Sequence, residues 1–152
     1  MKMTIEERLE KLEQELDKMK REVRSKMFTL VDDQGKERAT LCVHEYGSGL
    51  ILLDKNLKKR AMLFASDVGS SMTLSTKNGE IRVRLGVDED GQSLVLFDEK
   101  GNERALLGVN EKWIHLGLID EKGKHRVILG VSKDNTGLSL FDENGNTIWK
   151  AP

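Results

Sequence analysis

The chain has 152 residues with 25 basic and 26 acidic side chains, so its net charge at neutral pH is close to zero. This balance excludes the uniformly basic footprint of a nucleic-acid-binding protein. No apolar run approaches the roughly 18 residues of a membrane-spanning helix. Hydrophobic residues make up 38% of the chain and charged residues 34%, which favours a repeat or single-layer architecture with a large solvated surface.

The first segment, MKMTIEERLEKLEQELDK, is charged and lacks the apolar core of a secretory signal. We therefore expect no signal peptide, which leaves a cytoplasmic or a virion- or particle-associated location open.

Residues 1–27 carry an apolar side chain at alternating steps of four and three residues. The six positions are Ile5, Leu9, Leu12, Leu16, Met19 and Val23. Such spacing is the heptad pattern of a coiled coil, and Thr4 with Glu7 matches a capping box at the start of the helix. An isolated helix of this length is marginal in water, so the apolar stripe must contact another surface. We expect self-association, and docking of the helix on the chain's own β-domain is the alternative.

The pattern also indicates how many helices associate. Arg8-Leu9-Glu10-Lys11-Leu12-Glu13 resembles a short signature of trimeric coiled coils, in which an arginine at heptad position g reaches a glutamate at the following position e of a neighbouring helix. Arg8 and Glu13 occupy those two positions in this register. We therefore predict a trimerisation helix over residues 1–27.

Residues 28–152 consist of tandem 22-residue units that begin at residues 28, 50, 72, 94, 116 and 138, and the sixth unit is partial. The third position of every unit is leucine: Leu30, Leu52, Leu74, Leu96, Leu118 and Leu140. The eleventh position is arginine in five units: Arg38, Arg60, Arg82, Arg104 and Arg126. The eighth position is glycine in every unit except the second, which has Leu57. An internal period of this length predicts a repeat architecture.

Each unit has two stretches in which apolar residues alternate with polar ones, and a turn separates the stretches. The turn reads D-x-x-G except in the second unit, which has Leu57 for the glycine, and the third, which has Thr76 for the aspartate. This pattern predicts a β-hairpin, with leucines such as Leu96 and Leu107 on the interior face. An in-register parallel solenoid would stack the arginines at about 5 Å, where like charges repel. Antiparallel hairpins instead bring each arginine toward the aspartate of its own turn, as for Arg104 and Asp98.

The titratable residues give little indication of catalysis. Three histidines, His44, His115 and His125, occupy different repeat positions, and Cys42 is the single cysteine. We therefore expect no enzyme activity, no metal site and no cofactor. Trp113 stands where earlier units have glycine and is followed by His115. This pair is the candidate ligand or interface site, either as an exposed platform or, as favoured, as a plug against a neighbouring chain.

A helical stalk that leads directly into β-repeats, with Ser25-Lys26 as the hinge, resembles trimeric fibre proteins such as phage tail fibres and fibrous bacterial surface proteins. The resemblance covers the plan of the whole chain and transfers no binding residue. It implies attachment, spacing or recognition, with an unidentified surface or glycan as ligand.

We therefore expect a mainly β protein with an N-terminal α-helix, assembled as a homotrimer into a β-prism or an intertwined β-helix, with a structural or adhesive function. The alternative is a monomeric carbohydrate- or ligand-binding β-module with its helix docked on one side.

Overall fold

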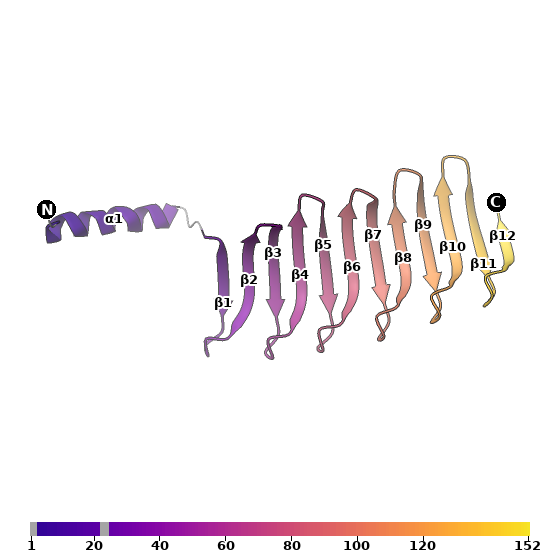
Figure 1. The fold of residues 1–152 in the computed structure, drawn as a ribbon, viewed down its shortest axis with the longest axis horizontal. Coiled ribbons are helices and arrows are strands. Elements are labelled where there is room, and N and C mark those ends of the chain that lie inside the picture. The colour runs from indigo at the N-terminus through magenta and orange to yellow at the C-terminus, as the bar shows by residue number, and fades with distance from the viewer. Residues whose placement is uncertain (1–2, 22–24) are drawn as a thin grey trace.

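A computed structural model describes residues 3–21 and 25–152 of the chain. Within these residues the chain forms one helix and a 12-stranded antiparallel sheet whose strands follow sequence order (Figure 1). The elements are α1 (Ile5–Arg21), β1 (Met27–Val31), β2 (Glu37–His44), β3 (Gly47–Leu53), β4 (Lys59–Ser66), β5 (Gly69–Ser75), β6 (Ile81–Asp88), β7 (Gly91–Phe97), β8 (Glu103–Val109), β9 (Trp113–Ile119), β10 (His125–Ser132), β11 (Thr136–Phe141) and β12 (Thr147–Ala151).

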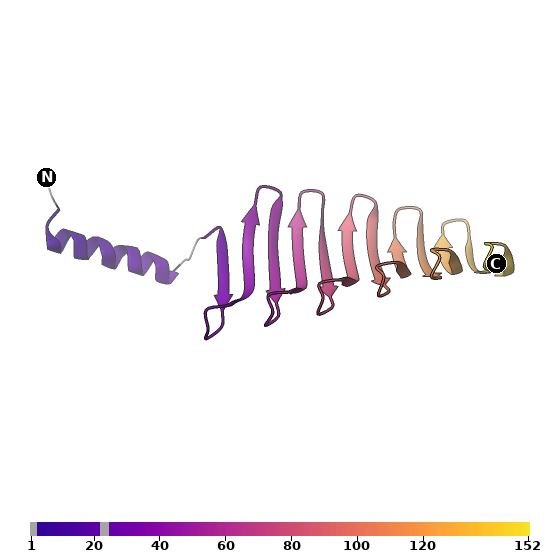
Figure 2. The ribbon, with the colours of Figure 1, turned by 60° about the horizontal axis from the view of Figure 1, so that its bottom comes forward.

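The predicted mainly β fold with an N-terminal helix and repeated β-hairpins is confirmed. The sheet is a single open layer, because β1 and β12 are its two edges and do not pair with each other. The view in Figure 2 foreshortens the C-terminal strands relative to the N-terminal ones, so the sheet twists along its length.

The helix begins with the capping box that the sequence predicts. The backbone N–H of Thr4 donates to Glu7 Oε2 at 2.7 Å, and the backbone N–H of Glu7 donates to Thr4 Oγ1 at 3.1 Å. These bonds satisfy two amide groups that have no partner inside the helix. Among the described residues, α1 makes no contact with any strand, and it lies beyond β1 at the N-terminal end of the sheet (Figure 1).

The D-x-x-G segments form the turns at one end of the strands. In the fourth unit, the N–H of Gly101 donates to the carbonyl of Asp98 at 3.1 Å, and Asp98 Oδ1 accepts from the backbone N–H groups of Lys100 and Asn102. Gly101 has a φ of 83°, a left-handed conformation that glycine adopts without steric conflict. Leu57 takes the same place in the second unit at a φ of 62°.

A β-bulge follows each turn, and in the first five units it contains the repeat's arginine. In the sixth unit Ile148 takes that place. In the fourth unit the register shifts between Leu96 and Phe97, so that Arg104 has no partner residue on β7. A bulge re-aims the side chain it carries. Arg104 Nε donates to the carbonyl of Ile119 in the following unit at 2.8 Å, while Nη1 lies 3.4 Å from Asp98 Oδ2. The predicted pairing of Arg104 with Asp98 is confirmed.

Candidate functional site

One face of the sheet carries two continuous rows of apolar residues, which we call the leucine face. Paired residues on neighbouring strands connect each row across all twelve strands of the described sheet. The first row contains Phe28, Leu41, Leu50, Leu63, Met72, Leu85, Leu94, Leu107, Leu116, Leu129, Leu138 and Ala151. The second row contains Leu30, Ala39, Leu52, Ala61, Leu74, Val83, Leu96, Ala105, Leu118, Val127, Leu140 and Trp149.

A single chain leaves this face uncovered. Leu96 is 43% exposed and Leu107 is 44% exposed, although the sequence predicts both as interior. The accessible surface of the described structure is 12228 Å². A compact monomer of 17.2 kDa exposes about 7,800 Å² by the usual scaling with mass. The chain therefore exposes about 4,400 Å² more than a compact fold of its mass would.

The helix is exposed in the same way. Ile5, Leu9, Leu12 and Leu16 are exposed along α1, at 85%, 57%, 61% and 49%. Arg8 and Glu13 are also exposed on the helix. The predicted seam residue Val23 lies outside the described residues, as does the side chain of Met19. The four described seam residues therefore form an apolar stripe with no partner within the described chain.

The opposite face of the sheet is better covered by its own side chains. Val95 is 2% exposed, Thr73 7% and Cys42 5%. The guanidinium of Arg84 on this face lies 5.3 Å from the ring centroid of Phe97. The two faces therefore differ, because only the leucine face presents continuous exposed apolar rows.

Trp113 and His115 lie together on this opposite face, both on β9. Their rings stack with centroids 4.3 Å apart and planes inclined by 14°. Glycines on the two neighbouring strands make room for them. A Cβ at Gly108 on β8 would lie 2.4 Å from His115 Cε1, and a Cβ at Gly130 on β10 would lie 3.2 Å from Trp113 Cε3.

The loop before β9 is held by an Asx turn. Asn110 Oδ1 accepts from the backbone N–H groups of Lys112 and Trp113, at 2.9 and 3.0 Å. His115 Nδ1 is buried and has no hydrogen-bond partner within the described part of the chain. Trp113 and His115 therefore lie side by side, on a face that the leucine rows do not share.

A shallow hollow of about 150 Å³ adjoins Trp113. Its lining residues come from β9 to β12 and the loop between β10 and β11: Trp113, Ile128, Gly130, Val131, Ser132, Asn135, Gly137, Ser139 and Lys150. Nothing in the repeat pattern indicates this hollow, because it depends on deviations from the repeat at Trp113 and Lys150. The replacement of glycine by Trp113 is the one local signal that marks the region.

The turn carboxylates are held in their charged form. Partial burial acts to raise the pKa of Asp98, but hydrogen bonds from Asn102, Lys100 and Arg104 outweigh it and lower the pKa from 3.8 to about 2. The pKa values of the equivalent aspartates are also lowered, in Asp32, Asp54 and Asp120 first by a backbone N–H bond and in Asp142 first by the Asn146 side chain. Carboxylates whose pKa is lowered by hydrogen bonds within their own turn have a structural role.

Within residues 3–21 and 25–152, no three His, Cys, Asp or Glu side chains lie together as metal ligands would. The described part of the chain also has no helix that is both long and apolar enough to cross a membrane. Among known proteins, no family model and no curated protein matches this chain.

Proposed function

We propose that the chain is a non-catalytic structural or adhesive protein that assembles as a homotrimer with a fibre-like plan. One observation carries the proposal: the leucine face runs uncovered across the 12 strands of the described sheet. Apolar surface of this extent is rare on a protein that remains monomeric in water, because covering it is favourable by about 25 cal/mol for each Å² removed from water.

Copies of the same chain fit this face. Every residue of the two rows is apolar, and in the second row leucine alternates with the smaller alanine or valine as far as Leu140, as at Leu96 and Ala105. An apolar surface with this regularity is complementary to a copy of itself, and most soluble oligomers are built from identical subunits. The leucine rows of the copies would then form a shared Leu/Val interior.

The heptad register supports three copies. Arg8 at position g and Glu13 at position e match the trimeric coiled-coil signature, and both are exposed on α1. Three helices would bury Ile5, Leu9, Leu12 and Leu16 in one seam. Three open sheets around the same axis would enclose the leucine faces as a β-prism or an intertwined β-helix, whose outer surface carries the opposite face of each sheet.

The alternative, a monomeric ligand-binding module, requires the helix to cover part of the sheet. In the described structure α1 lies clear of the strands, and its apolar stripe is exposed. The leucine face and the apolar stripe of α1 are therefore both uncovered within one chain. Assembly with further copies of the chain would cover both surfaces at once.

Subunit mixing tests the number of copies. Tagged and untagged chains are unfolded together, refolded at micromolar concentration and separated by native mass spectrometry. A homotrimer gives four species, with zero to three tags each. Three species would indicate a dimer, and two species at the mass of single chains would overturn the proposal.

A further inference from the structure

We infer that the hollow beside Trp113 binds a saccharide that carries a carboxylate group, as the recognition site of the display module. The inference rests on the proposed function in one respect only: assembly through the leucine faces leaves the opposite face of each sheet, with this hollow, on the outside. The evidence for the site itself comes from the geometry of one chain.

The face on which Trp113 lies favours an exposed platform for a ligand over a plug against a neighbouring chain. Trp113 pairs with Ser132, and His115 pairs with Gly130, whereas the leucine rows contain the alternate residues Leu116 and Leu129. Alternate residues of a strand point to opposite sides of the sheet. Trp113 is therefore not part of the surface that the assembly buries, and it remains 38% exposed.

The hollow has an aromatic wall and a floor of glycines. His115 packs against the Trp113 ring from the side of β8, where it lies over Gly108. The hollow lies on the other side of Trp113, toward β10 to β12, and Gly130 and Gly137 line it. An indole ring beside bare backbone offers a flat apolar surface, which matches the C–H face of a pyranose ring.

The lining of the hollow also contains polar side chains. The Asn135 carboxamide, the Ser139 hydroxyl and the Lys150 ammonium make no hydrogen bond or ion pair with another described residue. The Ser132 hydroxyl, by contrast, is engaged with the backbone of Asn135, donating to the carbonyl and accepting from the N–H at 3.1 Å. Three free polar side chains thus surround the aromatic wall.

The charge of the residues that line the hollow indicates which class of ligand it would bind. Lys150 is the only charged residue among the described residues that line the hollow. A carboxylate on the sugar would pair with its ammonium, while hydroxyls would bond to Asn135 and Ser139. An apolar wall combined with a few polar groups that fix orientation is typical of ligand sites. A sugar acid fits that combination better than a neutral sugar, which leaves Lys150 without a partner.

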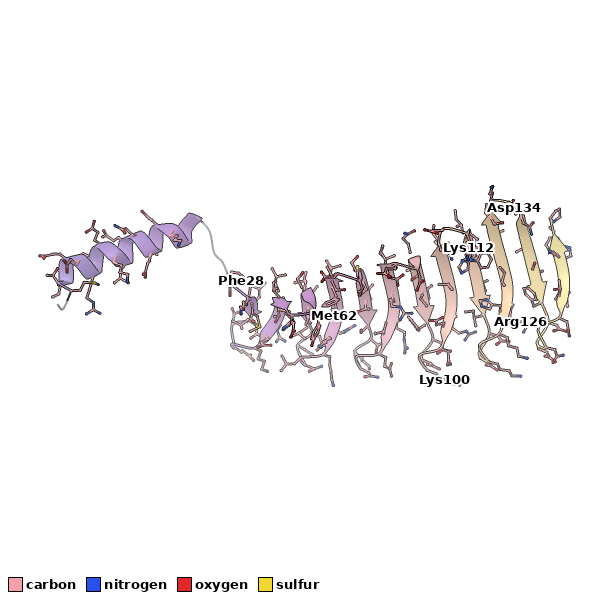
Figure 3. The ribbon with its side chains drawn as sticks, turned by 45° about the horizontal axis from the view of Figure 1, so that its top comes forward. Phe28, Met62, Lys100, Lys112, Arg126 and Asp134 are labelled. Carbon is pink, nitrogen blue, oxygen red and sulfur yellow. The ribbon has the colours of Figure 1, made fainter. Side chains whose placement is uncertain are left out.

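The hollow lies toward the end of the strands that carries the short loops, since its lining includes Ser132 at the end of β10 and Asn135 in the loop that follows. Figure 3 places Lys112, in the loop between β8 and β9, and Asp134, in the loop between β10 and β11, at the same end of the strands, whereas Arg126 lies toward the opposite end. In a homotrimer this end of the sheet occurs three times. A polymeric ligand that engages more than one copy would bind more tightly than one sugar unit does.

Tryptophan fluorescence tests the site on the full chain. Trp149→Phe leaves Trp113 as the only tryptophan, since the chain has two. In this background we expect an oligogalacturonate to shift the emission of Trp113 and a neutral oligosaccharide of the same length to bind at least tenfold more weakly. Binding of the oligogalacturonate should weaken further as salt is added, because the contact with Lys150 is exposed and ionic.

Two substitutions and one control locate the binding. Isothermal titration should show that Trp113→Ala in the unmodified chain weakens oligogalacturonate binding at least tenfold. Lys150→Ala should weaken it several-fold and remove the preference for the acidic sugar. Lys122→Ala, in the turn at the opposite end of the strands, should bind as the unmodified chain does.

Absence of binding to the oligogalacturonate, or equal binding by Trp113→Ala and the unmodified chain, would overturn the inference. The molar mass of each variant, measured in the same samples, separates this failure from failure of the trimer. A trimer without binding would contradict the saccharide site alone, and binding by a monomer would contradict the assembly alone.

Discussion

Arg104 donates a hydrogen bond from Nε to the main-chain carbonyl of Ile119, 15 residues further along the chain, at 2.8 Å. The same Nε contact recurs from Arg60 to the carbonyl of Ser75 and from Arg126 to the carbonyl of Phe141. In the first and third units, Nη1 of Arg38 and Arg82 donates instead to the carbonyl one residue further on, in Asp54 and Asp98. Each arginine thereby joins its own turn to the end of a strand in the next hairpin. The successive hairpins are linked by side chains as well as by strand pairing.

Loss of this link should destabilise the sheet. Arg104→Met keeps most of the side-chain stem and removes the charged donor, so we expect the free energy of unfolding to fall by roughly 1–2 kcal/mol. Lys100→Ala, in the adjacent turn, should change it by less than about 0.5 kcal/mol. Urea denaturation measures both, and similar small effects would show that the link contributes nothing.

The lowered carboxylate pKa values predict loss of stability in acid. The side chain of Asp98 is 17% exposed, and its pKa falls from 3.8 to about 2 on folding. A group with a lower pKa in the folded state contributes its full stability above pH 4 and loses it as the pH falls through the folded value. The melting temperature should therefore drop between about pH 4 and pH 2. Asp98→Asn keeps the turn geometry and should make this drop smaller.

Leu57 should be a site where substitution stabilises the protein. It has a φ of 62°, in a place where the other five units have glycine at 75° to 88°. The left-handed conformation costs a residue with a side chain about 1 kcal/mol. Leu57→Gly should therefore raise the free energy of unfolding by about that amount. Gly101→Ala provides the reciprocal change, because a Cβ there meets no atom within 4 Å, and it should lower stability by a similar amount.

A charge on the leucine face should prevent assembly. Leu107 is 44% exposed in one chain and would be buried between copies, so Leu107→Glu places a carboxylate in an apolar interior. We expect this variant to sediment as a monomer. Tyr46→Glu is the matched control, since Tyr46 is 79% exposed in the loop between β2 and β3. If both variants keep the mass of the unmodified protein, the leucine face is not the interface.

The features that the sequence predicts correctly are local. The capping box of Thr4 and Glu7 and the D-x-x-G turn at Asp98 each depend on residues a few positions apart, and the hairpins follow from alternation within one 22-residue unit. The Arg104–Asp98 pair spans six residues and depends on the same turn.

The features that it does not predict depend on neighbouring units. The bulge at Arg104 and its bond to Ile119 require the register between strands and the place of the next hairpin. The hollow beside Trp113 requires three consecutive strands and Lys150, which lies 37 residues further along the chain. Leu96 and Leu107 are predicted as interior from their alternation, but alternation identifies a face and not what covers it.

Molar mass in solution tests the central claim most directly. Light scattering coupled to size-exclusion chromatography, across a dilution series from high to low micromolar, should give three times the chain mass of 17.2 kDa. Because the leucine face and the helix seam would both be buried, the mass should remain constant over that range. A mass of 17.2 kDa throughout, with a melting temperature independent of concentration, would contradict the trimer and the role assigned to the leucine face.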